Sequence, residues 1–421
     1  MSLSRSVFET VRASAWVLAV MTAAAPAFAQ ADPRAFTIEQ LTERIIEGNR
    51  ELKAALIARD AAQSAVTVSR ALPNPRLEFN SGRSSPRSGF GGSGGLQQVT
   101  ATQLVEFGAV RSARLDTALA GERGASSSIA KVRNDLVAQI RLGAFEALLR
   151  QEEALAAADA LRLLDQVRER VRVRVDSGEA PRYEIIKADA EIITARQRRD
   201  SAALQAEKAL LELNRLAGGT LPPSWRLAAR LDEAPPKLAL ETLTRETIER
   251  SPELAILRAE VERARAQLQS AQASRWPGVE FKLDHSRDPE VTQNRVGISF
   301  SAPVLDNRAS AIEQASLELV RAQRLLDGRR DQLIQEVVLA WKELEIALGA
   351  VDALGQGAVR EAESALRVAE AAYRFGERGI LEVIDAQRVL RSVRFELLQA
   401  RFRLQSARIS LEHLAARYAG D

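Results

Sequence analysis

A glycine-rich segment and two histidines are the first places at which this 421-residue sequence could perform chemistry. Residues 89–94 read Gly-Phe-Gly-Gly-Ser-Gly, which fits the G-x-G-x-x-G spacing of dinucleotide-binding loops. Such a loop binds a pyrophosphate when it links a strand to a helix, whereas this segment lies between two strand-like stretches, so we interpret it as a hairpin loop. His285 and His413 are far apart in the sequence; we expect His285 at the surface and His413 packed in a helix bundle. Since cysteine, a P-loop and an H-E-x-x-H motif are also absent, we predict no enzyme, no cofactor and no metal site.

Two carboxylates near the C-terminal end have the spacing of residues that act together. Glu382 and Asp385 are one helical turn apart, so a helix would present both on one face. They follow Tyr373 and a turn that contains Gly376 and Gly379. The elements that position this turn therefore decide what the two acids can do.

The same turn occurs twice in the chain. Residues 173–188 repeat the outline of residues 371–386, and the spacing from Gly178 to Gly376 equals that from Glu184 to Glu382. Other pairs at nearly the same spacing are Leu52 with Leu254, Phe145 with Trp341, and Leu213 with Leu411. Such internal similarity predicts two copies of one structural unit. We place a first repeat at 36–219 (hairpin about 76–107, turn about 177–181), a linker at 220–240, and a second repeat at 241–417 (hairpin about 279–304, turn about 375–379).

Long helices are predicted for most of each repeat. Residues 38–71, with Thr37 as the N-cap, form a helix that stops at two prolines, and residues 182–216 form a second helix. Residues 110–176 contain no proline and predict one helix roughly 100 Å long. Because the two shorter helices together nearly match the long one, they would stack end to end beside it, with both hairpins at one end and both turns at the other. In the last helix, apolar residues alternate at steps of three and four, which predicts a coiled coil: Leu390, Val393, Leu397, Ala400, Leu404, Ala407, Leu411 and Leu414.

Four strand-like stretches alternate apolar and polar side chains. In residues 279–284, Val279, Phe281 and Leu283 would face one way and Glu280, Lys282 and Asp284 the other. This alternation fits either a soluble sheet or a membrane barrel with a polar lumen. Four strands leave no second layer to cover the apolar face, and they are too few to close a barrel, since membrane barrels need about eight. The strands should therefore be shared between subunits.

Charge and the N-terminal segment restrict the location and partners. The 59 basic and 56 acidic residues nearly balance, which argues against nucleic acid as the main partner. Residues 1–29 have the features of a signal peptide: Arg5 and Arg12 precede an apolar run, and Ala27-Phe-Ala29 is a typical cleavage site. We expect an exported protein without membrane-spanning helices, so that any place in a membrane must come from strands.

These residues resemble the TolC-like family of outer-membrane efflux and secretion channels over residues 36–414. The resemblance rests on the duplicated plan, on the strand-to-helix segments 103–108 (QLVEFG) and 302–307 (APVLDN), and on the pattern from Tyr373 to Ala386. Segments 71–75 (ALPNP) and 178–184 (GEAPRYE) are most similar to the cobalt–zinc–cadmium resistance branch. The resemblance implies a mostly helical fold with a small β part, in which a homotrimer forms a 12-stranded barrel in the outer membrane above a helical tunnel through the periplasm.

The resemblance also implies roles for the residues at the turns. Tyr373 and Arg378 would donate to Glu184 in a lock that holds the tunnel end shut. Glu382 and Asp385 would form an acidic ring; if three copies of each converge on the axis, passing cations are favoured. Family members often have Asp where this chain has Glu, which changes the lock distances. A periplasmic adaptor would dock at the turns; the residues expected to contact it are Gly178, Ala180, Gly376, Gly379, Ile380 and Leu381. From the residues alone, Gly376 and Gly379 are interpreted as helix caps.

Several functions remain open at this point. The first is passive efflux of heavy-metal cations delivered by an inner-membrane pump of the RND type through a periplasmic adaptor. Export of drugs and other small organic molecules, or type I secretion, would use the same fold. Among other classes, a periplasmic adaptor usually has one helical hairpin rather than a tandem duplication, and a purely structural coiled-coil protein would not need alternating strands.

Overall fold

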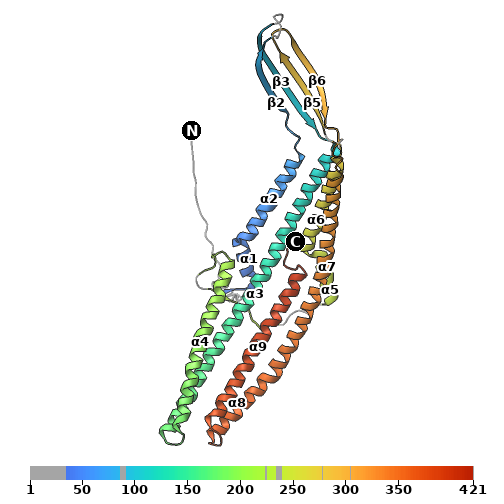
Figure 1. The fold of residues 1–421 in the computed structure, drawn as a ribbon. Helices are drawn as coiled ribbons and strands as arrows, with labels where there is room; N and C mark the ends of the chain where they lie inside the picture. The colour runs from blue at the N-terminus through green and yellow to red at the C-terminus, as the bar shows by residue number, and fades with distance from the viewer. Residues whose placement is uncertain are drawn as a thin grey trace, which may run out of the picture.

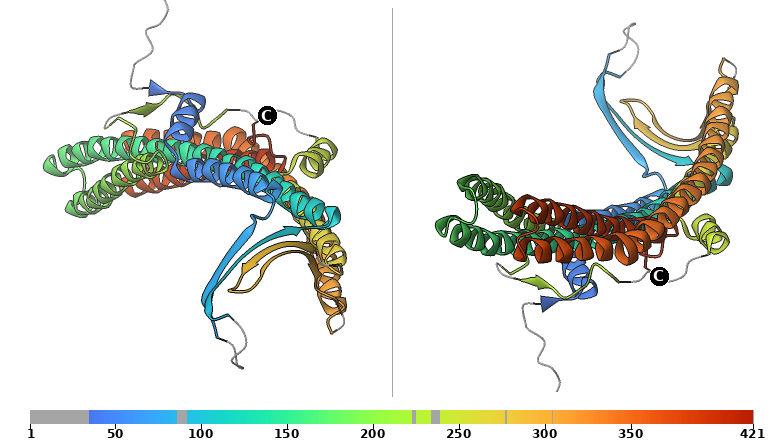
Figure 2. Two further views of the ribbon diagram at one scale, coloured as in Figure 1. Left: turned by 90° about the horizontal axis from the view of Figure 1, so that it is seen from above. Right: turned by 90° about the horizontal axis from the view of Figure 1, so that it is seen from below.

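The computed structural model describes residues 35–85, 92–222, 225–233, 239–276, 278–303 and 305–420. The expected signal peptide, most of the loop at 86–91, parts of the linker, and Pro277 and Val304 at the bounds of the second hairpin lie outside these ranges. The described chain is elongated: a four-stranded sheet stands at one end and two helix turns at the other (Figure 1). Seen from above and below, the helices follow a curved layer, and the sheet lies over its concave side (Figure 2).

The first repeat contains four main helices and a hairpin. Helices α1 (Ile38–Gly48) and α2 (Arg50–Arg70) precede strands β2 (Arg76–Ser84) and β3 (Gly94–Val105). Helix α3 (Gly108–Asp176) has 69 residues, and α4 (Arg182–Leu216) returns beside it. A short parallel pair, β1 (Ala35–Phe36) with β4 (Arg226–Leu227), lies near mid-height, where Phe36 meets Trp225 edge-on. The predicted stacking of shorter helices along the long one is confirmed (Figure 1).

The second repeat follows the same plan. Helices α5 (Leu240–Arg250) and α6 (Pro252–Ala273) precede β5 (Val279–Arg287) and β6 (Thr292–Phe300). The long helix of this repeat is continuous but changes type along its length. Helix α7 (Ala309–Asp352) leads into a six-residue π-helix, η1 (Ala353–Ala358), which leads into α8 (Val359–Arg374). Helix α9 (Ile380–Leu414) returns beside α7 and α8. The counterpart α3 is α-helical throughout.

The prediction of one helix at residues 38–71 was wrong in one respect, because the chain breaks at Asn49. The Asn49 side chain caps α2 by accepting a hydrogen bond from the backbone N–H of Leu52 at 2.9 Å, and its amide donates to Leu216 O at 3.5 Å. Ser251 caps α6 in the same way at the equivalent place in the second repeat. Thr37 is the predicted N-cap of α1, with a reciprocal bond to Gln40. The break lets each short helix turn around the mid-height core.

Two apolar cores at mid-height are built from equivalent residues. In the first, Leu41, Phe145 and Leu213 pack together; in the second, Leu243 and Leu411 pack with Trp341 at the edge. Burying such side chains contributes about 1.5–3 kcal/mol each. These cores hold the helices together where α1 meets α4 and α5 meets α9. From there the α3–α4 and α8–α9 hairpins extend to the two turns, which we call the tip.

A polar network ties the end of α9 to α3 at the same height. His413 Nε2 lies 2.7 Å from Asp135 Oδ1, and Lys131 Nζ donates to Asp135 Oδ2 at 2.7 Å. Burial favours the neutral form of Asp135, but the hydrogen bonds from Lys131 and His413 outweigh it and hold the pKa of this carboxyl below its ordinary value. His413 is therefore packed between helices, as predicted.

The sheet has the strand order β2-β3-β5-β6 and is antiparallel throughout, so one hairpin of each repeat meets the other at the β3–β5 pair. Its faces differ as predicted: Phe281, Ile298 and Phe300 are exposed on one face. On the other face Asp284 accepts hydrogen bonds from Thr100 and Arg295 at 2.9 and 3.1 Å, which joins three strands. Within the described residues β2 and β6 are edge strands of this sheet. No helix in the described ranges has the length and apolar character needed to cross a membrane.

Candidate functional site at the two turns

Each turn ends its long helix with the same backbone hydrogen bonds. In the first, Glu179 N donates to Arg174 O at 2.8 Å, and in the second, Glu377 N donates to Ala372 O at 3.0 Å. Gly178 and Gly376 have φ of 80° and 73°, a conformation that favours glycine. This is the Schellman arrangement, so the cap interpretation of Gly376 is confirmed. Gly379 has an ordinary φ of −77° and serves as the N-cap residue of α9.

Tyr373 lies inside the tip rather than on its surface. Its side chain is only 7% exposed and packs with Val171, Ile380 and Ile384. The Arg174 guanidinium lies over the Tyr373 ring, 4.8 Å from its centroid, and so joins the first turn to the second. The Tyr373 hydroxyl is buried without a hydrogen-bond partner among the described residues. A buried hydroxyl left in that state costs about 1–3 kcal/mol, which favours a small shift that would satisfy it.

Glu184 reaches from the first turn to the second. Its Oε1 lies beside Gly379, where an added Cβ would be 3.8 Å away, and its Oε2 is buried without a partner among the described residues. A carboxylate at this position also lies near the N-terminus of α9, which favours negative charge. The single chain shows no hydrogen bond from Tyr373 or Arg378 to Glu184. The Tyr373 hydroxyl, a donor, and Glu184 Oε2, an acceptor, nevertheless both lie buried and, among the described residues, unpaired in the tip of this chain.

The acidic pair is largely compensated by arginines of the same chain. Arg378 Nη1 donates to Glu382 Oε1 at 2.6 Å, so Arg378 pairs with the next acid along its own segment rather than with Glu184. Asp385 is 71% exposed and lies 3.5 Å from Arg388, which also pairs with Glu191 of α4. The hydrogen bond to Glu191 raises the pKa of Arg388. Glu382 and Asp385 are both exposed at the tip, but neither charge is isolated.

The expected docking residues differ in accessibility. Leu381 is 40% exposed and Ala180 is half-buried, so both present surface near the turns. Ile380 is fully buried in the apolar cluster of the tip. Ile380 therefore supports the turn from within, while Leu381 offers the exposed side chain.

In the lock that the resemblance implies, replacing Tyr373 by Phe is expected to raise the resting conductance about five-fold, because a hydrogen bond to Glu184 worth about 1 kcal/mol would be absent from the closed state. The ring packing and the Arg174 contact would remain, so the unfolding temperature should not fall. Planar-bilayer recording of purified protein measures the effect. Tyr183→Phe is the matched control, since Tyr183 is exposed at the first turn. Equal conductance for both variants would mean that the Tyr373 hydroxyl has no part in closing the tip.

Sequence reasoning missed a groove between the helical hairpins α3–α4 and α8–α9, on the side of the turns that faces mid-height. Its volume is about 1510 Å³, and α3, α4, α8 and α9 line it. Arginines dominate its charged lining: Arg150, Arg198, Arg388, Arg391, Arg394 and Arg401. Burial and the nearby Arg198 lower the pKa of Arg391. The three-residue spacing of Arg388, Arg391 and Arg394 is a sequence pattern that could have indicated this basic surface.

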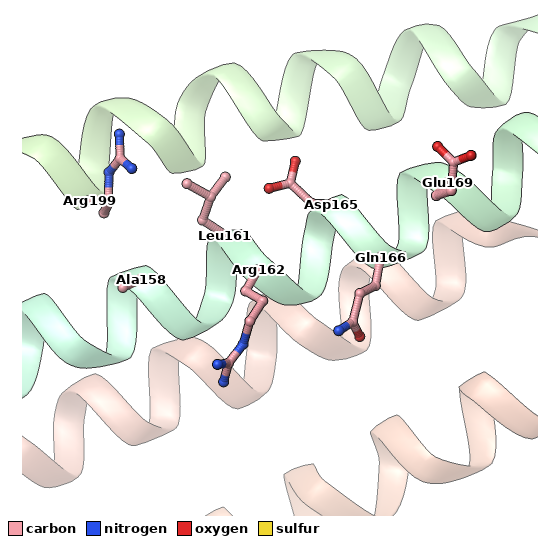
Figure 3. A pocket seen from close by; sticks show the side chains of 7 residues that line it. All are labelled: Ala158, Leu161, Arg162, Asp165, Gln166, Glu169 and Arg199. Carbon is pink, nitrogen blue, oxygen red and sulfur yellow. The ribbon is translucent and has the colours of Figure 1, made fainter.

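The described residues hold no group of three or more acidic or histidine side chains that could bind a metal ion. A smaller hollow of about 470 Å³ between α3 and α4 contains Asp165 and Glu169, with Arg199 on the facing helix (Figure 3). Two carboxylates beside an arginine fall short of the oxygen ligands that a hard cation requires.

The family described as outer membrane efflux protein matches residues 41–219 and 243–417. The cobalt-zinc-cadmium resistance protein CzcC of Cupriavidus metallidurans is 25% identical over 400 residues, which cover 94% of each chain. The pyoverdine export outer membrane protein OpmQ of Pseudomonas aeruginosa is 22% identical, over 88% of this chain and 83% of its own. The solved structure of the outer-membrane channel OprN has the same fold, with a TM-score of 0.78, 17% identity and 91% of each chain covered.

Proposed function

This chain belongs to the outer membrane efflux protein family, and we propose that it is the outer-membrane channel of a tripartite efflux system. In this role it gives substrates from an inner-membrane pump a passive exit and catalyses no reaction. The observation that carries the proposal is the combination of an exposed apolar sheet face with a single helix, α3, that extends roughly 100 Å from the sheet end to the turns. The sheet would sit in the outer membrane, and the hairpins would cross the periplasm towards the pump.

The channel would be a homotrimer. One chain supplies four strands with open edges at β2 and β6, and backbone groups at an edge in lipid must find partners. Pairing β6 of one copy with β2 of the next would close a barrel of twelve strands after three copies. The same closure would bring three copies of each tip together around one axis.

A periplasmic adaptor would dock at the tip and connect the channel to a pump of the RND type. Ala180 and Leu381 offer small and apolar surface beside the two turns. Docking that favours the open tip would shift the open–closed equilibrium, since a ligand moves such an equilibrium by its differential affinity for the two states.

Heavy-metal cations are the cargo that we favour, because the CzcC relative matches over nearly the whole of both chains. Small organic molecules are the alternative, supported by the pyoverdine exporter that matches over most of this chain. The two cargoes predict different sensitivities in a deletion strain, to toxic metals in the first case and to drugs in the second.

The test is a deletion strain assayed for growth with zinc, cobalt, cadmium, copper and a panel of common drugs. We expect hypersensitivity to at least one of the metals and rescue by the wild-type gene, with SDS-resistant trimers in outer-membrane fractions. Sensitivity to drugs alone would transfer the proposal to small organic cargo. A soluble periplasmic monomer would overturn the channel function itself.

A further inference from the structure

The apolar face of the sheet, which would point outward to lipid, changes from apolar to cationic along its strands. Strand pairing aligns Leu77, Ala101, Leu283 and Val296 in one row, and Phe79, Val99, His285 and Asn294 in the next row towards the hairpin ends. The following row holds Ser81, Gln97, Arg287 and Thr292, and Arg83 stands one row further on β2. Polar character thus begins at the His285–Asn294 pair, whose side chains lie 2.6 Å apart.

Arg83 and Arg287 are exposed and have no ion-pair or hydrogen-bond partner for their side chains among the described residues. The inward face differs, because Arg295 there pairs with Asp284 at 3.0 Å. The acids at the same end are engaged elsewhere: Asp288 accepts a backbone hydrogen bond from Val291 at 2.6 Å, and Glu290 accepts one from Gly92. The outward arginines therefore keep their positive charge available.

The height of these arginines fits the boundary of a membrane. Eight residue steps separate Val279 from Arg287 on β5, which is roughly 26 Å along the strand. With the usual strand tilt this gives about 20 Å along the membrane normal, close to the roughly 25 Å height of the apolar band of outer-membrane barrels. A guanidinium at this level would lie at the headgroups of the outer leaflet, where it can bind phosphate through two parallel hydrogen bonds.

We propose that Arg83 and Arg287 form a binding surface for phosphorylated lipid headgroups in the outer leaflet of the membrane. This proposal rests on the proposed function, since it requires the sheet to lie in the outer membrane with its hairpin ends outward. Three copies around the barrel would present six guanidinium groups. The surface would fix the depth of the barrel by pairing charge above an apolar band.

The experiment uses the full-length protein purified in non-ionic detergent, with bis-phosphorylated lipid A and its dephosphorylated form as probes for native mass spectrometry. We expect the wild type to retain the phosphorylated lipid preferentially. The double variant Arg83→Gln/Arg287→Gln should bind it roughly 20-fold more weakly and lose the preference, since each arginine near an anionic surface contributes about five-fold. Arg83→Lys/Arg287→Lys should keep much of the binding, because the charge remains.

The matched control is Arg50→Gln/Arg196→Gln, which removes two exposed arginines from α2 and α4 outside the sheet. It should bind like the wild type. Equal affinity of the wild type for both lipids, or of the Arg83/Arg287 double variant and the wild type for the phosphorylated lipid, would overturn the proposal. SDS resistance and conductance are measured on the same samples: if they persist while lipid preference is absent, this proposal alone fails, and if trimers are absent, the proposed channel fails.

Discussion

Ile298→Lys is expected to abolish the SDS-resistant trimer in the outer membrane, whereas Ser299→Lys at the next residue should retain it. Ile298 is 65% exposed on the apolar face of the sheet, and Ser299 points to the opposite, polar face. A lysine on the lipid side of a barrel costs about 2–4 kcal/mol near the middle of the bilayer, and a trimer would incur that cost three times. A lysine in a wet lumen carries no comparable cost.

The comparison is sharp because the two variants lie next to each other on one strand and introduce the same charged side chain. Heat-modifiable mobility of outer-membrane fractions on SDS gels gives the measurement, and circular dichroism of purified protein shows whether the helices persist. Loss of the trimer in Ser299→Lys with retention in Ile298→Lys would mean that the faces are assigned the wrong way round. Retention in both would mean that the sheet does not face lipid.

Arg378→Gln is expected to increase the preference of the channel for cations. Arg378 neutralises Glu382 at 2.6 Å in each chain, so its removal would uncover one carboxylate per copy at the tip. An exposed pair of this kind is worth about 0.2–1 kcal/mol, which predicts a change in permeability ratio of about 1.4- to five-fold. The reversal potential across a planar bilayer with a potassium chloride gradient measures it.

Three further variants separate the contributions. Arg378→Lys keeps the positive charge and should behave like the wild type, and Glu382→Gln in the Arg378→Gln background should cancel the gain. Glu361→Gln removes an exposed acid from α8, away from the turn, and should leave the reversal potential unchanged. An unchanged potential in Arg378→Gln, and also after reversing both Glu382 and Asp385 to lysine, would exclude these acids from the ion path.

The regular parts of the fold could be predicted because their signals are local. Helix α4 begins and ends at the predicted residues, and the alternation in β5 and β6 identified their faces. The break at Asn49 was missed because apolar spacing continues through it. A capping residue at Asn49, and Ser251 before Pro252 in the second repeat, were the available signals.

The site could be predicted less completely, because its contacts join residues distant in the sequence. The stacking of Arg174 on Tyr373 and the pairing of Arg388 with Glu191 each connect one repeat with the other. The spacing within one helix contains no information about such pairs. The pairing of Arg378 with Glu382, four residues on, is predictable from their spacing, whereas the resemblance implied Glu184 as the partner of Arg378.

The π-helix η1 rotates α8 about the helix axis relative to α7, and the first repeat has no equivalent segment within α3. Each residue added to an α-helix turns everything beyond it by about 100° around the axis, and wide turns such as η1 accommodate such additions. The rotation of α8 about the helix axis, and with it the direction in which Leu366 and Tyr373 point, therefore does not follow from the α-helical spacing that places Val337 and Leu344 on α7. Insertion or loss of a single residue in this segment would rotate the end of the α8–α9 hairpin about its axis, while the sheet and the α3–α4 hairpin keep their orientation.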